Sequence, residues 1–219
     1  MRLNPLAERP WKGLLWLTLE EAGVVVARDR VRIPYRLPDG RELYAKIVTT
    51  TGRVWCEPPP LSVGGLVPFG LETLPVDRRD ESLLFVNEGE SCALAVREAL
   101  AKWDRFPGGV YTIALPGAGT WRPAWRDYVK DFRHIVVVPD GDEPGDRMAD
   151  AVLRDLPWSR RVLLPAGEDA RSIVQAGGAR GLMPFLAAAD LSWRMKAALL
   201  FTDGYETFKE LVDGGLVDG

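Results

Sequence analysis

Residues 135–146 read IVVVPDGDEPGD. The first four are apolar and bulky, and so short an apolar run is typical of a strand buried on both faces of a sheet. The run ends at Pro139, and Asp140 and Asp142 follow on either side of Gly141. Carboxylates crowded at the end of a buried strand raise each other's pKa, so this placement calls for a positive partner.

The stretches on either side predict the same architecture. Short buried strands are expected at 83–87, 109–117, 134–140 and 160–167, and each is followed by a segment with helical spacing, at 91–103, 121–132, 146–156 and 169–177. Strand and helix therefore alternate four times. This alternation predicts the α/β class, with a parallel sheet covered by helices on both faces.

The N-terminal part has a different pattern. Residues 6–22 favour a short amphipathic helix, and residues 23–55 alternate as β-strands, with a hairpin turn at 38–40. Between residues 25 and 55 there are seven Lys or Arg and three Asp or Glu, although the whole chain has a net charge of −3. We therefore expect a basic, β-rich α+β subdomain before the parallel sheet. The predicted units are 1–80, 81–180 and a short helical extension, 181–219.

Composition excludes several classes of protein. Among 219 residues there are two cysteines, Cys56 and Cys92, and a single histidine, His134, too few for a zinc ribbon or a Ser-His-Asp enzyme. No apolar run reaches 18 residues, and the N-terminus does not read as a signal peptide. These features predict a cytoplasmic protein without a membrane partner.

Three carboxylates are expected to meet at one edge of the parallel sheet. Glu88 follows its first strand, and Asp140 and Asp142 follow its third. Ligands of open parallel sheets bind beyond the carboxyl ends of the strands. An all-oxygen set of ligands suits Mg²⁺ or Mn²⁺, and a metal held there serves phosphoryl transfer by orienting and neutralising phosphate oxygens.

Four segments resemble, in order, the conserved segments of Toprim domains: LLFVNEGESCALAV, IALPGAGTW, IVVVPDGDEPGDRMADAV and LLPAGEDARSIV. They are most similar to those of bacterial replicative primases and of phage and mitochondrial primase–helicases. The resemblance implies a metal-dependent nucleotidyltransferase of DNA replication. Its invariant glutamate corresponds to Glu88, as metal ligand or general acid/base, and its Asp-x-Asp pair to Asp140 and Asp142. Asp169 is implied as a further metal ligand, and Glu90 as a residue that tunes the site.

The resemblance continues upstream and covers residues 21–180. The segment before Toprim in those primases supplies basic residues to a single-stranded DNA template and to nucleoside triphosphates, and Arg30 and Lys46 fall on its basic positions. From this and from the basic cluster, we expect five residues to contact nucleic acid or nucleotide: Arg28, Arg30, Lys46, Arg53 and Trp55.

The chain also departs from the pattern. Cys92 stands where those primases usually carry an aspartate, and Ser172 stands at the second acid of a later Asp-x-x-Asp element. Both changes are expected to weaken a second metal. A zinc-containing template reader and a Walker A loop are not found, so a helicase or template reader is expected to be a separate chain.

Two other functions stay open at this point. A Toprim phosphodiesterase, which is a nuclease, would use the same carboxylates. A non-catalytic protein that binds single strands and recruits a helicase would need only the basic segment. The choice between DNA and RNA product, the initiation sequence and the oligomeric state also remain open.

Overall fold

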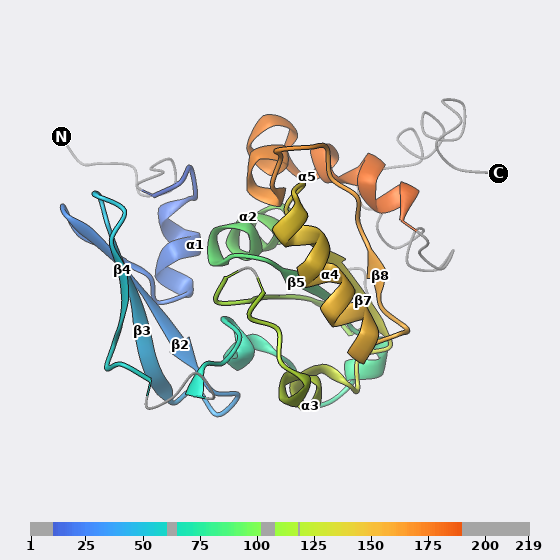
Figure 1. Cartoon of the computed structure of the whole chain (residues 1–219), viewed down its shortest axis with the longest axis horizontal. Coiled ribbons are helices and arrows are strands. Elements are labelled where there is room, and N and C mark those ends of the chain that lie inside the picture. The colour runs from blue at the N-terminus through green and yellow to red at the C-terminus, as the bar shows by residue number, and fades with distance from the viewer. Residues whose placement is uncertain (1–10, 61–64, 102–107, 118, 190–219) are drawn as a thin grey trace.

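The computed structural model describes residues 11–60, 65–101, 108–117 and 119–189. Figure 1 shows an antiparallel sheet beside a parallel sheet, with strand orders β1-β2-β3-β4 and β6-β5-β7-β8. The strands are β1 (Val25–Val26), β2 (Arg30–Arg36), β3 (Glu42–Thr49), β4 (Val54–Glu57), β5 (Leu83–Asn87), β6 (Val110–Ala114), β7 (His134–Val138) and β8 (Arg160–Arg161). The helices are α1 (Trp16–Glu21), α2 (Glu90–Leu100), α3 (Arg126–Val129), α4 (Glu143–Asp155) and α5 (Ala170–Ala188).

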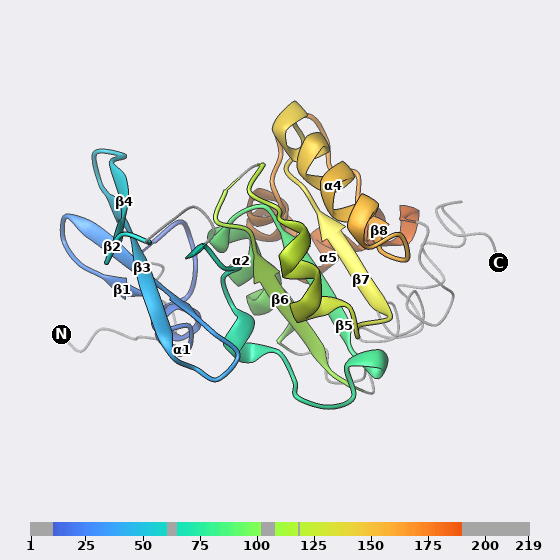
Figure 2. The same cartoon turned by 60° about the horizontal axis from the view of Figure 1, so that its bottom comes forward.

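The parallel sheet is built around β5, of which all five residues are buried. Its alternate residues enter two cores, one on each face of the sheet. Leu84 and Val86 pack with residues of α3 and α4, and Leu83 and Phe85 pack with residues of α5 and one side of α2. Figure 2 shows α4 in front of the sheet and α2 and α5 behind it. The predicted α/β architecture, with helices on both faces and a small β-rich part before it, is confirmed.

The strands of the parallel sheet are aligned at their carboxyl ends. Asn87 at the end of β5 lies opposite Ala114 of β6 and Val138 of β7. Residues that follow β5 and β7 therefore emerge side by side. This alignment positions the candidate site.

The two sheets share one core. Tyr35 of β2 stacks on Tyr44 of β3 at 4.7 Å between ring centroids, and Phe69 meets Tyr35 edge-on at 5.8 Å. Phe69 also exchanges two backbone hydrogen bonds with Ala114 of β6, of 2.8 and 3.1 Å. These contacts connect the antiparallel sheet to the edge of the parallel sheet.

Some elements are shorter than the sequence predicts. The helix expected at 6–22 begins at Trp16, because Lys12 and Gly13 have positive φ angles of 49° and 73°; residues 1–10 lie outside the described part. Residues 121–132 form one 3₁₀ turn, which begins at Pro123, and the four-residue α3; the residue before a proline is disfavoured in helical conformation, so the helical segment does not begin earlier. The strand expected at 160–167 is reduced to two residues of β8.

The C-terminal part is partly described. Helix α5 continues past residue 180 to Ala188, with a non-helical Gly178 at φ 60° and ψ −150°. The rest of the expected extension, 190–219, lies outside the described residues. The division at 80 and 180 therefore stays a prediction. In the described ranges, no helix is both long and apolar enough to cross a membrane.

Candidate functional site

Glu88 and Asp140 meet at the carboxyl edge of the parallel sheet. Glu88 directly follows β5 and is 8% exposed. Its Oε2 accepts a hydrogen bond of 3.2 Å from the backbone N–H of Asp140, which follows β7. The alignment of β5 and β7 thus brings together two carboxylates that are 52 positions apart in the chain.

The loop after β7 is held in a close turn by two glycines. A Cβ at Gly141 would lie 2.0 Å from the carbonyl oxygen of Pro165, and one at Gly145 would lie 2.2 Å from that of Asp140. Only glycine allows such an approach of backbone to backbone. The turn places Asp142 at the N-cap of α4, where its Oδ1 accepts a 2.8 Å hydrogen bond from the Gly145 N–H.

The site concentrates negative charge. The pKa of Asp140 is raised to about 7, first by burial and then by the charges of Glu88, Asp169 and Asp142. Burial also raises the pKa of Glu88, as does Asp142, whereas the N–H of Asp140 lowers it. The raised pKa values of Asp140 and Glu88 show that the protein only partly neutralises the negative charge of these carboxylates.

The residues present fit a hard divalent cation in their chemistry. Glu88, Asp140 and Asp142 offer only oxygen atoms as ligands. A bound cation would offset the repulsion between neighbouring carboxylates that helps to raise the pKa of Asp140. Over the described residues, no three Asp, Glu, His or Cys side chains already surround a common point.

The carboxylate of Asp169 caps the N-terminus of α5. Its Oδ1 accepts a 2.6 Å hydrogen bond from the Ser172 N–H, and its Oδ2 accepts one of 2.9 Å from Arg171. The Ser172 hydroxyl in turn accepts from the Asp169 N–H at 3.0 Å, which completes a capping box at the start of α5. Burial acts to raise the pKa of Asp169, but these donors prevail and lower it. Ser172, which stands where the related primases carry an acid, therefore stabilises the start of α5.

Cys92 lies directly against the acidic edge. It is buried, and its Sγ donates a long hydrogen bond of 3.8 Å to Oδ1 of Asp140. Burial, together with the charges of Asp140 and Asp169, raises the pKa of this thiol to about 12. At neutral pH the residue is a neutral donor in a place where an aspartate would add negative charge.

Lys46 reaches the same edge from the antiparallel sheet. Its ammonium lies 2.7 Å from Oε1 of Glu90 and donates a 3.1 Å hydrogen bond to the carbonyl of Pro116. Glu90 also accepts from the hydroxyl of Tyr35. The contacts of Glu90 are thus with the antiparallel sheet, and its predicted role of tuning the metal carboxylates has no direct contact behind it.

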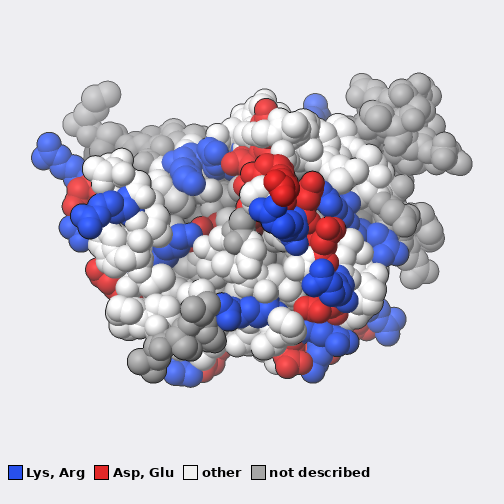
Figure 3. Space-filling view, in the orientation of Figure 1, with Lys and Arg blue, Asp and Glu red and all other residues white. Residues whose placement is uncertain are grey.

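Of the other predicted nucleic-acid residues, Arg28, Arg30 and Arg53 lie toward the end of the antiparallel sheet farther from Lys46, whereas Trp55 pairs with Ile47, next to Lys46. Arg30 pairs in register with Thr49, next to the turn that holds Arg53, and it makes an exposed ion pair of 2.9 Å with Asp29. Arg28 and Arg53 are exposed. Trp55, on the edge strand β4, is 36% exposed and donates to Glu57 at 2.6 Å. In Figure 3, Lys and Arg colour the outer tip of this sheet, and Asp and Glu gather over the start of α4.

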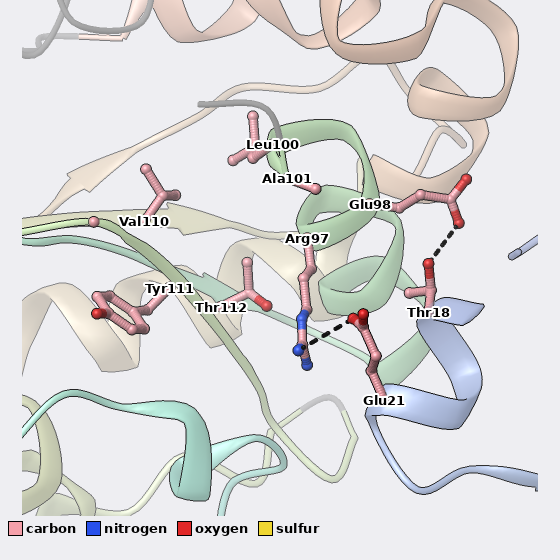
Figure 4. Close-up of a pocket in the computed structure, with 10 residues that line it drawn as sticks. Thr18, Glu21, Arg97, Glu98, Leu100, Ala101, Val110, Tyr111 and Thr112 are labelled. Carbon is pink, nitrogen blue, oxygen red and sulfur yellow. Dashed lines mark hydrogen bonds and ion pairs between the residues drawn. The ribbon is translucent and has the colours of Figure 1, made fainter. Parts of the chain in front are cut away.

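Two cavities distinguish the ends of the parallel sheet. One of about 370 Å³ is lined by the acidic loop, including Asp140 and Asp142, and by Arg161. The other, of about 380 Å³, lies between α1, α2 and β6 (Figure 4). Its polar groups are paired with one another, as in the 3.2 Å hydrogen bond from Thr18 to Glu98. We therefore interpret the second cavity as a packing gap between α1, α2 and β6 and not as a ligand site.

Sequence reasoning missed two residues of the site. Tyr35 was read only as part of a strand, and its bond to Glu90 depends on how the sheets pack, for which the sequence has no signal. Arg171 was also missed, although its position two residues after Asp169, at the start of a helix, is a detectable signal for pairing.

Comparison with known proteins supports this fold. No protein-family model matches the chain. The gene 57 protein of Mycobacterium phage D29 is 37% identical over 75 residues, which are 34% of this chain and 49% of that protein, so the match spans about half of the relative. The primase fragment of the bacteriophage T7 primase-helicase protein superposes with a TM-score of 0.65 at 21% identity, covering 80% of this chain and 72% of that one. The DnaG primase catalytic domain bound to ssDNA gives a TM-score of 0.57 at 22% identity, covering 92% and 70%. The chain therefore has the fold of primase catalytic cores.

Proposed function

We propose that this protein is a metal-dependent, primase-like nucleotidyltransferase that joins nucleotides on a single-stranded DNA template. One observation carries the proposal: Glu88 and Asp140 are in contact at the carboxyl edge of the parallel sheet, and Lys46 reaches that edge from the antiparallel sheet. Acidic groups for a cation and a basic group for a phosphate thus lie on one side of a primase-type fold.

The carboxylates at the edge of the parallel sheet would bind the metal ion. Glu88, Asp140 and Asp142 would hold Mg²⁺ or Mn²⁺, with Asp169 close enough to influence the charge of Asp140. A bound ion would orient and neutralise phosphate oxygens. Glu88 is buried and its pKa is raised, which suits a group that holds or releases a proton at its carboxylate.

The antiparallel sheet would guide the template. Arg28, Arg30 and Arg53 are positioned to meet phosphates, and Trp55 offers an exposed ring on which a base can stack. The T7 structure comes from a primase-helicase protein. We infer that this chain works with a helicase or a zinc-containing template reader.

A primer-extension assay tests the proposal. Wild-type protein is given a pre-annealed primer on a single-stranded template, labelled nucleotides and Mg²⁺ or Mn²⁺. We expect extension that is lost in the double variant Asp140→Asn/Asp142→Asn. The matched control is Asp127→Asn/Asp131→Asn, which removes two exposed carboxylates near α3 and should keep activity.

The same assay separates the alternatives. Cleavage without extension at every nucleotide concentration would identify a nuclease. Single-strand binding with neither reaction would identify a recruiting module. Extension that survives the loss of both aspartates would contradict the proposed site.

A further inference from the structure

A buried carboxylate connects the two sheets beside the candidate site. Glu90 is the first residue of α2 and is 6% exposed. Its Oε1 accepts from the hydroxyl of Tyr35 on β2 and lies 2.7 Å from the ammonium of Lys46 on β3. A single oxygen atom of the parallel sheet's first helix is therefore held by two strands of the other sheet.

These contacts fix the direction in which Glu90 points. A buried carboxylate is tolerated only when it is paired and hydrogen-bonded. Burial of Tyr35, followed by the charge of Glu90, raises the pKa of that hydroxyl, so it remains a donor. The Tyr35 ring is itself immobilised by stacking on Tyr44. Glu90 is thus oriented toward the antiparallel sheet and the end of the Lys46 side chain.

Lys46 is ordered by this arrangement. A lysine ammonium has three N–H donors. One N–H donates to Glu90 and a second to the Pro116 carbonyl, at 3.1 Å. Among the described residues, the third N–H has no hydrogen-bond acceptor. A free lysine side chain samples many rotamers, and these two contacts restrict the Lys46 side chain before any ligand binds.

We infer that Glu90 is a positioning residue, which holds the ammonium of Lys46 near Pro116, the residue that follows Leu115 at the carboxyl end of β6, so that its remaining N–H meets a phosphate of the incoming nucleoside triphosphate. The inference rests on the proposed function and names the ligand of Lys46 within it. It also gives Glu90 a task that differs from tuning the metal carboxylates.

A double-mutant cycle tests this role through nucleotide kinetics. Glu90→Gln should raise the KM for nucleotide about tenfold, the size expected for weakening one charge-assisted hydrogen bond, with a smaller change in kcat. Lys46→Met should raise it at least as much. Because Glu90 acts through Lys46, the double variant should be no worse than Lys46→Met alone.

Two further variants separate positioning from general stability. Tyr35→Phe keeps the stacked ring and removes only the donor to Glu90, so we expect a smaller rise in KM. Glu98→Gln alters another carboxylate of α2, which bonds to Leu15 and Thr18, and should leave the KM unchanged. Additive effects in the cycle, or an equal rise in KM for Glu98→Gln, would overturn the inference.

A measurement without catalysis keeps the two proposals distinguishable. Acylation of Lys46 by an amine-reactive reagent, read by mass spectrometry, should be slow in the wild type and faster in Glu90→Gln and Tyr35→Phe. If the wild type extends no primer, the proposed function fails, and this reactivity still reports on how Lys46 is held. If the wild type is active but Lys46 reactivity and KM are the same in Glu90→Gln, the positioning role is wrong.

Discussion

The two sheets handle charge in opposite ways. Every residue of β5 in the parallel sheet is buried, whereas β4 at the edge of the antiparallel sheet has no buried residue. The central strands of a sheet covered on both faces can present charge only beyond their ends, and Glu88 and Asp140 lie there, whereas Arg160 and Arg161 lie on the edge strand β8. The antiparallel sheet carries cations on both of its faces: Lys46 pairs with Ile33, and Arg30, three residues before Ile33, faces the opposite side.

This difference separates chemistry from binding. The acidic edge is a single point defined by aligned strands, so a change there should affect the reaction almost entirely. The basic sheet is a distributed surface on which each cation contributes a part, so its loss should be graded. The predictions below break or sharpen this contrast, beginning with the largest effect.

The largest effect is expected at Glu88. Glu88→Gln keeps the size of the side chain and can still accept from the Asp140 N–H, but it removes the negative charge. Primer extension should fall by about 100-fold or more, the scale of losing a general acid/base or a metal ligand. Template binding, measured by fluorescence anisotropy, should be nearly unchanged, because it depends on the other sheet.

Glu81 provides the matched control for this change. It precedes β5 at the opposite end of the same strand, where it pairs with Arg78 at 2.6 Å. Glu81→Gln should retain full extension. Persistent extension by Glu88→Gln, or an equal loss in both variants, would remove Glu88 from the site.

A graded effect is expected along the antiparallel sheet. Lys46→Ala and Arg30→Ala should each raise the Kd for single-stranded DNA by only part of the total, because each cation is already paired, Lys46 with Glu90 and Arg30 with Asp29. Each variant should also reduce the slope of log Kd against log salt by up to about one, as one phosphate contact is lost. Anisotropy titrations from 50 to 300 mM salt measure both quantities, and a larger loss for Arg30→Ala would shift the template path to the outer tip.

The sequence predicts the acidic edge well because its causes are local. A buried run at 134–138 must be a strand, and the residues after it must lie at a sheet edge. The local sequence does not show that β5 and β7 are neighbouring strands, and this follows from the topology of the sheet. The capping box at Asp169 and Ser172 was not predicted, because the usual pattern has Ser or Thr at the N-cap and Glu or Gln three residues later.

The basic side of the site was less predictable because its causes are not local. Lys46 was expected to contact nucleic acid, but its partner Glu90 is the first residue of helix α2 and lies 44 positions away in the chain. That pairing follows from the packing of β2 and β3 against the start of α2. Helix 6–22 was predicted too long for a simpler reason: positive φ at Lys12 and Gly13 is a backbone choice that helical spacing does not reveal.

The smallest effect concerns the stability of the metal-free protein. The pKa of Asp140 rises from 3.8 to about 7 on folding, so its contribution is most favourable below about pH 4 and is lost as the pH rises through 7. Asp140→Asn removes this loss, keeps an acceptor for Cys92, and should melt about 2–4 °C higher than wild type at pH 8 in EDTA, which corresponds to roughly 1 kcal/mol after allowance for solvent screening. The difference should shrink as the pH is lowered to 5, and it should shrink at pH 8 when millimolar Mg²⁺ neutralises the wild-type edge. Asp127→Asn, on the exposed side of α3, should show neither trend in the same thermal scans. A gain that is independent of both pH and Mg²⁺ would mean that the acidic edge carries no excess charge, and the contrast between the two sheets would lose its electrostatic basis.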